Sequence, residues 1–247
     1  MQKIIRVSAV SYLNAKPFVY GLQNSGVLKQ TDLALDHPAE CARKLISKEV
    51  DIGLVPVAAI EQIPNAKIIS DYCIAADGEV ASVLLLSNVP LEKIQSVVMD
   101  HESRTSVLLA KILAHFYWKI KPQWLDEKNA EFKKINTTIA TVVIGDKALA
   151  LRNSYQYKYD LSLEWKKFTG LSFVFACWVA NTEIDENYLQ LFNKALAYGL
   201  ENRNLIMESL PKGNYDVRKY LTENIHYMLD SEKRKGMKKF FTLSKQI

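Results

Sequence analysis

The sequence predicts an α/β protein whose chain is divided between two lobes with a cleft between them. Short apolar, β-branched segments alternate with helical patterns along the first part of the chain, which is typical of parallel sheets with crossover helices. A second, smaller α/β unit follows, and long apolar strands around Val83 and Phe175 bracket it. If the chain crosses between the units at both strands, it forms a hinge whose closure encloses a ligand.

Each element is indicated by its own hydrophobic pattern. In the first unit we expect strands at residues 4–10, 33–36, 50–56, 67–70 and 80–86, and a helix at 38–48. In the second unit we expect strands at 96–98, 142–146 and 173–179, and helices at 107–118, 147–151 and 160–168. The remaining chain is predicted to form helices at 186–201, 217–229 and 232–243. Lobe 1 is then expected to hold residues 1–85 and 177–247, and lobe 2 residues 86–176.

The composition is that of a soluble globular protein: of 247 residues, 49% are apolar and 24% are charged. No apolar run reaches the roughly 18 residues of a membrane span, so no membrane partner is expected. A strand begins almost at the first residue without a signal-type segment, and the three cysteines lack metal-type spacing, which together predict a cytoplasmic protein with reduced cysteines and no metal. The net charge of +5 favours anionic ligands, but no nucleic-acid motif accompanies it.

The stretch 99–106 is the most informative one for function. A short strand precedes it and an apolar helix follows it, so we expect a strand-to-helix turn with Ser103 as the helix N-cap. The start of a helix carries unpaired N–H groups and the positive end of the helix dipole. Here three hydroxyls and the guanidinium of Arg104 lie beside it, which predicts a site for a carboxylate or phosphate. An ordinary capped helix is the alternative interpretation.

Two further polar positions are candidates for ligand contact. Ser11 and Asn14 follow the first strand, and Pro17 comes early in the next helix, so both polar residues lie at the carboxyl end of a strand, where α/β sheets bind ligands. Asn14 is equally suited to capping the same turn. Ser82 lies among apolar residues, so its hydroxyl needs a partner in the fold or in a ligand.

Several segments, taken together and in order, resemble the chorismate dehydratases of the futalosine route of menaquinone biosynthesis. The matching segments lie between residue 4 and about residue 180 and are Tyr12-Leu13-Asn14-Ala15 with Pro17, Asp51-Ile52-Gly53-Leu54-Val55-Pro56, Val80 with Ser82-Val83, Asp100, Ser103-Arg104-Thr105-Ser106, Ile144-Gly145-Asp146 with Ala148-Leu149, Tyr159-Asp160-Leu161, Glu164-Trp165, Thr169-Gly170-Leu171, and Phe173-Val174-Phe175-Ala176 with Trp178. Ser8, Val57-Ala58 and Ser172 depart from the family pattern.

The resemblance implies a type II periplasmic-binding-protein fold and the dehydration of chorismate to 3-[(1-carboxyvinyl)oxy]benzoate, without metal or organic cofactor. The partner is a small dicarboxylate, and a monomer or homodimer is expected. Carried over residue by residue, the implied catalytic residues are Asn14, Ser82 and Arg104. The implied substrate-binding residues are Ser11, Pro56, Ser103, Thr105, Ser106, Gly145 and Asp146.

Under this hypothesis the Ser-Arg-Thr-Ser turn holds one carboxylate, while Asn14 and Ser82 hold the second carboxylate or the C4 hydroxyl. The base is either the carboxylate on the enolpyruvyl arm of chorismate or His101. Two alternatives remain. One is a dihydroxynaphthoate synthase-like enzyme of the same fold, for which a histidine is expected where this chain has Gly145; the other is a non-catalytic anion-binding or sensor protein.

Overall fold

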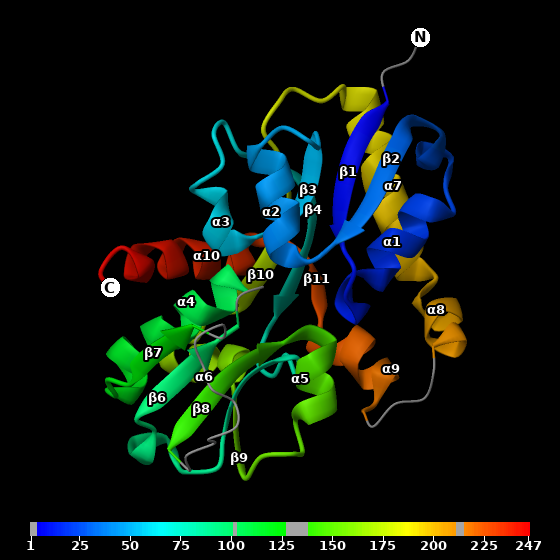
Figure 1. Ribbon diagram of the computed structural model, residues 1–247. Helices are drawn as coiled ribbons and strands as arrows, with labels where there is room; N and C mark the ends of the chain where they lie inside the picture. Colours follow the sequence, from blue (N-terminus) through cyan, green and yellow to red (C-terminus); the bar gives the residue numbers. More distant parts are fainter. Residues whose placement is uncertain (1–3, 101–102, 127–137, 211–214) are drawn as a thin grey trace.

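The computed structural model describes residues 4–100, 103–126, 138–210 and 215–247, and within them it contains two β-sheets. Figure 1 shows the first sheet in the upper part of the molecule and the second sheet in the lower part, with helix α10 beside the place where they meet. The first sheet has the strand order β11-β4-β10-β3-β1-β2 and the second has the order β7-β6-β8-β5-β9.

The first sheet is parallel at one edge and antiparallel at the other. β1 pairs in parallel with β2 and β3, whereas β10 runs antiparallel to both β3 and β4. Its strands are β1 (Ile5–Val10), β2 (Thr31–Asp36), β3 (Ile52–Pro56), β4 (Lys67–Ala76), β10 (Phe173–Ala180) and β11 (His226–Met228). Every residue of β3 is buried, as expected for a strand covered by helices on both faces.

The second sheet is built in the same mixed way. β6 pairs in parallel with β7 and β8, and β5 runs antiparallel to β8 and β9. Its strands are β5 (Val83–Ser87), β6 (Ser96–Met99), β7 (Gln123–Asp126), β8 (Ile139–Ile144) and β9 (Tyr157–Asp160). The chain leaves the first sheet after Ala76 and returns to it at Phe173. The lobe boundaries expected at 85 and 176 therefore fall inside β5 and β10, a few residues from the crossings.

The helices cover the sheets and carry the connections. Those of eight or more residues are α1 (Lys16–Gln23), α2 (Pro38–Ile46), α4 (Arg104–Ile112), α6 (Leu161–Thr169), α7 (Glu186–Glu201) and α10 (Ser231–Ser244). The shorter ones are α3 (Val57–Ile60), α5 (Gly145–Leu151), α8 (Arg203–Ser209) and α9 (Val217–Lys219). Within the described ranges, no helix has the length and apolar character needed to cross a membrane. All three cysteines are buried and free of disulfides.

The prediction of one helix over residues 217–229 is wrong. The segment forms only α9, one π-helical turn over Tyr220–Asn224, and then strand β11, which pairs with β4 at the edge of the first sheet. The sequence Ile225-His226-Tyr227-Met228 is rich in β-branched and aromatic residues, and this preference for a strand prevails once an open sheet edge is available. The change matters because it brings Tyr220 and Tyr227 into contact with Ser82 and Asn14, two residues of the cavity described below.

Candidate active site

Segments that are far apart in the sequence converge on one cavity between the two sheets. The cavity is lined by Val10, Tyr12, Asn14, Pro38, Pro56, Ile74, Val80, Ser82, Val83, Ser103, Thr105, Ser106, Ile144, Gly145, Phe175 and Ala176. Seven of the ten predicted site residues are therefore brought together here: Asn14, Pro56, Ser82, Ser103, Thr105, Ser106 and Gly145.

The start of α4 forms one wall, and its hydroxyls are buried. Ser103 is the N-cap, as predicted, and its Oγ accepts a hydrogen bond from the backbone N–H of Ser106 at 3.2 Å. Thr105 Oγ1 accepts from the backbone N–H of Ala58 at 3.1 Å, so this side chain joins α4 to the start of α3. Ser103 and Ser106 face the cavity at the positive end of the helix.

Asn14 and Ser82 form the opposite wall. Oδ1 of Asn14 is buried and has no hydrogen-bond partner among the described residues. Because this atom is an acceptor, the group it lacks is a donor such as a hydroxyl. Ser82 is 1% exposed, and its Oγ accepts from the hydroxyl of Tyr220 at 2.8 Å. Tyr227 supports the same wall, since its hydroxyl donates to the backbone carbonyl of Asn14 at 3.0 Å.

The backbone before Ser82 is held in an unusual conformation. Ala81 has φ of 65°, in the left-handed region that costs a non-glycine residue about 1–2 kcal/mol. The buried carboxylate of Asp160 stabilises it by accepting the N–H groups of Val80 at 3.2 Å and Ala81 at 2.7 Å. The same carboxylate accepts two N–H groups at the start of α6. Burial raises the pKa of Asp160 to about 6, although these backbone hydrogen bonds lower it in part.

Three predicted site residues lie outside the cavity. The exposed Arg104 side chain donates from Nη1 to Oε1 of Gln62 at 2.8 Å, and it lines a separate surface groove. Ser11 is exposed, and its backbone N–H donates to the carbonyl of Asp36. Asp146 is exposed, and its Oδ1 accepts from the backbone N–H of Leu13 at 3.1 Å. His101, the predicted alternative base, lies outside the described residues.

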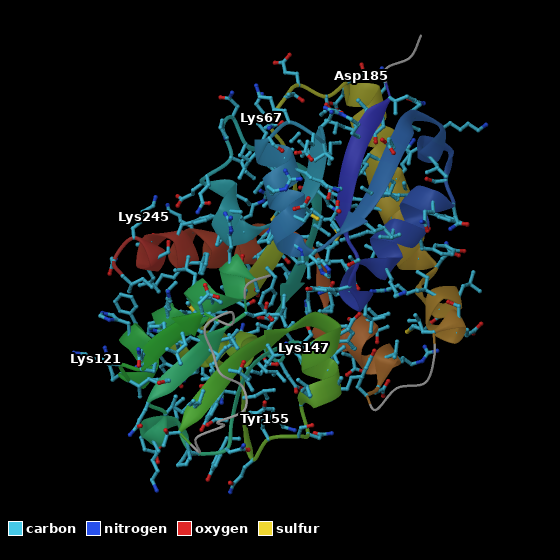
Figure 2. The ribbon with its side chains drawn as sticks, viewed as in Figure 1. Lys67, Lys121, Lys147, Tyr155, Asp185 and Lys245 are labelled. Carbon is cyan, nitrogen blue, oxygen red and sulfur yellow. The ribbon has the colours of Figure 1, made fainter. Side chains whose placement is uncertain are left out.

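Arg104 and Asp146 instead join the elements of the two sheets. Together with Thr105, they make hydrogen bonds between segments that belong to the two different sheets and their helices. No lysine or arginine is among the described residues that line the cavity. Figure 2 shows the side chains of Lys67, Lys121 and Lys245 at the outer edge of the molecule, where all three are exposed. The cavity therefore offers an anion neutral hydroxyl and amide donors.

Gly145 is constrained by Tyr12, its neighbour across the cavity. Its φ is 60°, and a Cβ at this position would lie 2.9 Å from Cδ2 of the Tyr12 ring. Real Cβ atoms essentially never show so short a contact. A histidine here would have to displace the ring and adopt a strained backbone, which argues against the arrangement expected of a dihydroxynaphthoate synthase-like site.

Tyr220 and Tyr227 are functional candidates that the sequence interpretation missed. They are separated from the residues they contact by 138 and 213 positions, so no local pattern connects them with Ser82 or Asn14. A signal was present in the strand-forming composition of residues 225–228, which would have shown that this segment belongs to a sheet rather than to a surface helix.

The architecture of two sheets around a central cavity is that of the periplasmic-binding-protein class, as predicted. The chain superposes on a protein of Archaeoglobus fulgidus with a TM-score of 0.76 and 12% identity, covering 98% of this chain and 97% of that one. It superposes on the periplasmic aliphatic sulphonate binding protein SsuA of Escherichia coli with a TM-score of 0.61 and 13% identity, covering 100% and 88%. At these identities the likeness shows the fold alone.

The chain belongs to the menaquinone biosynthesis family, whose model matches residues 5–246. It is 27% identical to a chorismate dehydratase of Campylobacter jejuni over 248 residues, or 96% of each chain. It is 26% identical to a chorismate dehydratase of Thermus thermophilus over 227 residues, or 82% of this chain and 83% of the relative. The predicted family is confirmed, and both relatives are dehydratases.

Proposed function

We propose that the protein dehydrates chorismate to 3-[(1-carboxyvinyl)oxy]benzoate in the futalosine route of menaquinone biosynthesis. The family membership and the two dehydratase relatives support this activity. The strongest structural support is that Asn14 Oδ1, an acceptor without a hydrogen-bond partner among the described residues, and the hydroxyl of Ser82 both line the same cavity. A substrate hydroxyl is both a donor and an acceptor, so it suits this pair better than a carboxylate does.

In the proposed complex, the C4 hydroxyl of chorismate donates to Asn14 Oδ1 and accepts from Ser82. A carboxylate lies at the start of α4, where the hydroxyls of Ser103 and Ser106 and the helix dipole stabilise negative charge. The apolar remainder of the lining, such as Phe175 and Ile144, surrounds the ring. Electrostatic interactions with these donors are strengthened because much of the remaining lining is apolar.

The reaction needs a proton removed at C3 and the hydroxyl lost from C4. Removal of the C3 proton sends the electron pair through the conjugated C1=C2 bond into the ring carboxylate, where hydrogen-bond donors stabilise it. The electron pair then returns and expels the C4 hydroxyl, which takes up the proton that the base removed from C3 and leaves as water. Its loss makes the ring aromatic. We propose that the carboxylate on the enolpyruvyl arm is the base, because tethering gives it a high effective concentration. A cytoplasmic location and a monomeric or dimeric state stay predictions.

The test is to incubate the purified protein with chorismate and to analyse the mixture by mass spectrometry and proton NMR. The proposal expects a product lighter by one water, with the aromatic signals of a ring substituted at positions 1 and 3. Chorismate that binds but is returned unchanged would instead identify an anion-binding or sensor protein. An amidated analogue of the arm carboxylate is expected to bind without dehydration; its dehydration would exclude the substrate carboxylate as base.

A further inference from the structure

Tyr220 is a buried residue that does not line the cavity but whose hydroxyl contacts Ser82, a residue that does. It lies in the π-helical turn that precedes β11 and is 2% exposed. Its hydroxyl donates to Ser82 Oγ at 2.8 Å, and Ser82 in turn lines the cavity. Among the described residues, Tyr220 is the partner recorded for the Ser82 hydroxyl.

This hydrogen bond has a consequence for the direction of the Ser82 proton. A serine hydroxyl has one proton and two acceptor lone pairs. Because Tyr220 donates to one lone pair, the Ser82 hydroxyl is the acceptor in this bond, and its own proton remains available to the cavity. Without the phenol, the Ser82 proton could instead point backward or toward a backbone carbonyl, and the cavity would lose a donor.

The phenol acts as a fixed donor rather than as an acid. Burial raises the pKa of Tyr220, and its hydrogen bond with Ser82 opposes this only in part. The neutral phenol is therefore retained at physiological pH, and loss of its proton would leave a buried anion. Tyr220 can thus polarise Ser82 throughout the reaction without giving up its proton.

We propose that Tyr220 is a positioning residue for the dehydration reaction: its hydroxyl directs the Ser82 proton into the cavity, where Ser82 donates it as a hydrogen bond to the departing C4 oxygen of the substrate. This inference rests on the proposed function. It assigns a catalytic consequence to the C-terminal segment, which contributes no residue of its own to the cavity lining.

The test compares Tyr220→Phe, Ser82→Ala and the double variant with the wild type in chorismate turnover. We expect Tyr220→Phe to lower kcat about 10- to 100-fold and to change KM less than about threefold, since the oriented donor is needed most as the C–O bond breaks. In the Ser82→Ala background, the same substitution is expected to change kcat less than about twofold, because the group that it orients is already absent.

Tyr188→Phe is the matched control. Its hydroxyl also forms a buried 2.8 Å hydrogen bond, to Thr31 Oγ1, but neither residue lines the cavity. Its loss should leave kcat unchanged. Full activity of folded Tyr220→Phe, or equal losses in the wild-type and Ser82→Ala backgrounds, would overturn the inference while leaving the proposed function in place. A wild type that does not convert chorismate would overturn both.

If Tyr220→Phe does not fold, a more acidic fluorinated tyrosine at position 220 provides a second test. An ionised phenol cannot donate, so the alkaline loss of kcat should move to lower pH than in the wild type. A pH profile identical to that of the wild type would overturn the inference.

Discussion

Substituting Gly145 by alanine perturbs the contact between the two sheets in a way that the structure allows us to quantify. Two costs are expected. A non-glycine residue in the left-handed region costs about 1–2 kcal/mol, and Gly145 has φ of 60°. The new Cβ would also lie 2.9 Å from the Tyr12 ring, and such overpacking typically costs about 1–3 kcal/mol. Gly145→Ala is therefore expected to lower the free energy of unfolding by about 2–5 kcal/mol.

Gly170→Ala separates the two contributions. Gly170 has φ of 73°, but no atom lies within 4 Å of the position of its missing Cβ, so this variant carries the backbone cost alone. Urea unfolding of both variants should show Gly145→Ala to be less stable than Gly170→Ala by about 1–3 kcal/mol. In a Tyr12→Ala background, the two substitutions should cost the same. If Gly145→Ala costs no more than Gly170→Ala in the wild-type background, then Tyr12 does not crowd position 145.

Three further predictions concern individual side chains. Asn14→Ala and Ser82→Ala should each lower kcat more than about tenfold with little change in melting temperature, because both polar atoms face the cavity; a large loss of melting temperature with normal kcat would make them structural. Arg104→Ala should change kcat/KM less than about threefold, since the exposed guanidinium binds Gln62. A hundredfold loss measured in steady-state assays would instead show that Arg104 contacts the substrate. The pKa of Asp160 is raised from 3.8 to about 6 in the folded protein, so the stability that its protonated form contributes is present below pH 4 and is lost as the pH rises to about 6. The expected loss in wild type, on the order of 3 kcal/mol, should be absent from urea titrations of Asp160→Asn, and identical pH dependence in the two proteins would contradict it.

The sequence predicts the placement of a side chain well where local geometry determines which way that side chain faces. Ser103 and Ser106 are three residues apart on a helix, so they share a face, and the apolar residues of α4 turn that face toward the interior. Arg104 points away from the face that Ser103 and Ser106 share. The order of residues in the turn did not reveal this, because the same residue types serve as helix caps and as ligand contacts. Its cationic side chain remains in water, where its desolvation cost is small.

The remaining errors arise from contacts between distant segments. Tyr220 and Tyr227 reach the site only because residues 226–228 add a strand to β4, and an edge strand depends on a partner elsewhere in the chain. The hydrogen bond from the backbone N–H of Ala81 to the carboxylate of Asp160 likewise joins residues that are 79 positions apart. The order of strands and helices, by contrast, follows from local periodicity, which explains why most of the first sheet was predicted correctly while the helix at 217–229 was not.

Under the proposed function, this cavity dehydrates the chorismate that it binds. The most direct measurement is a single-turnover experiment with protein in excess over chorismate, quenched over time and analysed by mass spectrometry for wild type and Ser82→Ala. We expect complete conversion by the wild type to a product one water lighter, and conversion more than about tenfold slower by Ser82→Ala with the substrate still bound. Equal rates in the two proteins, or bound chorismate that the wild type never converts, would contradict it.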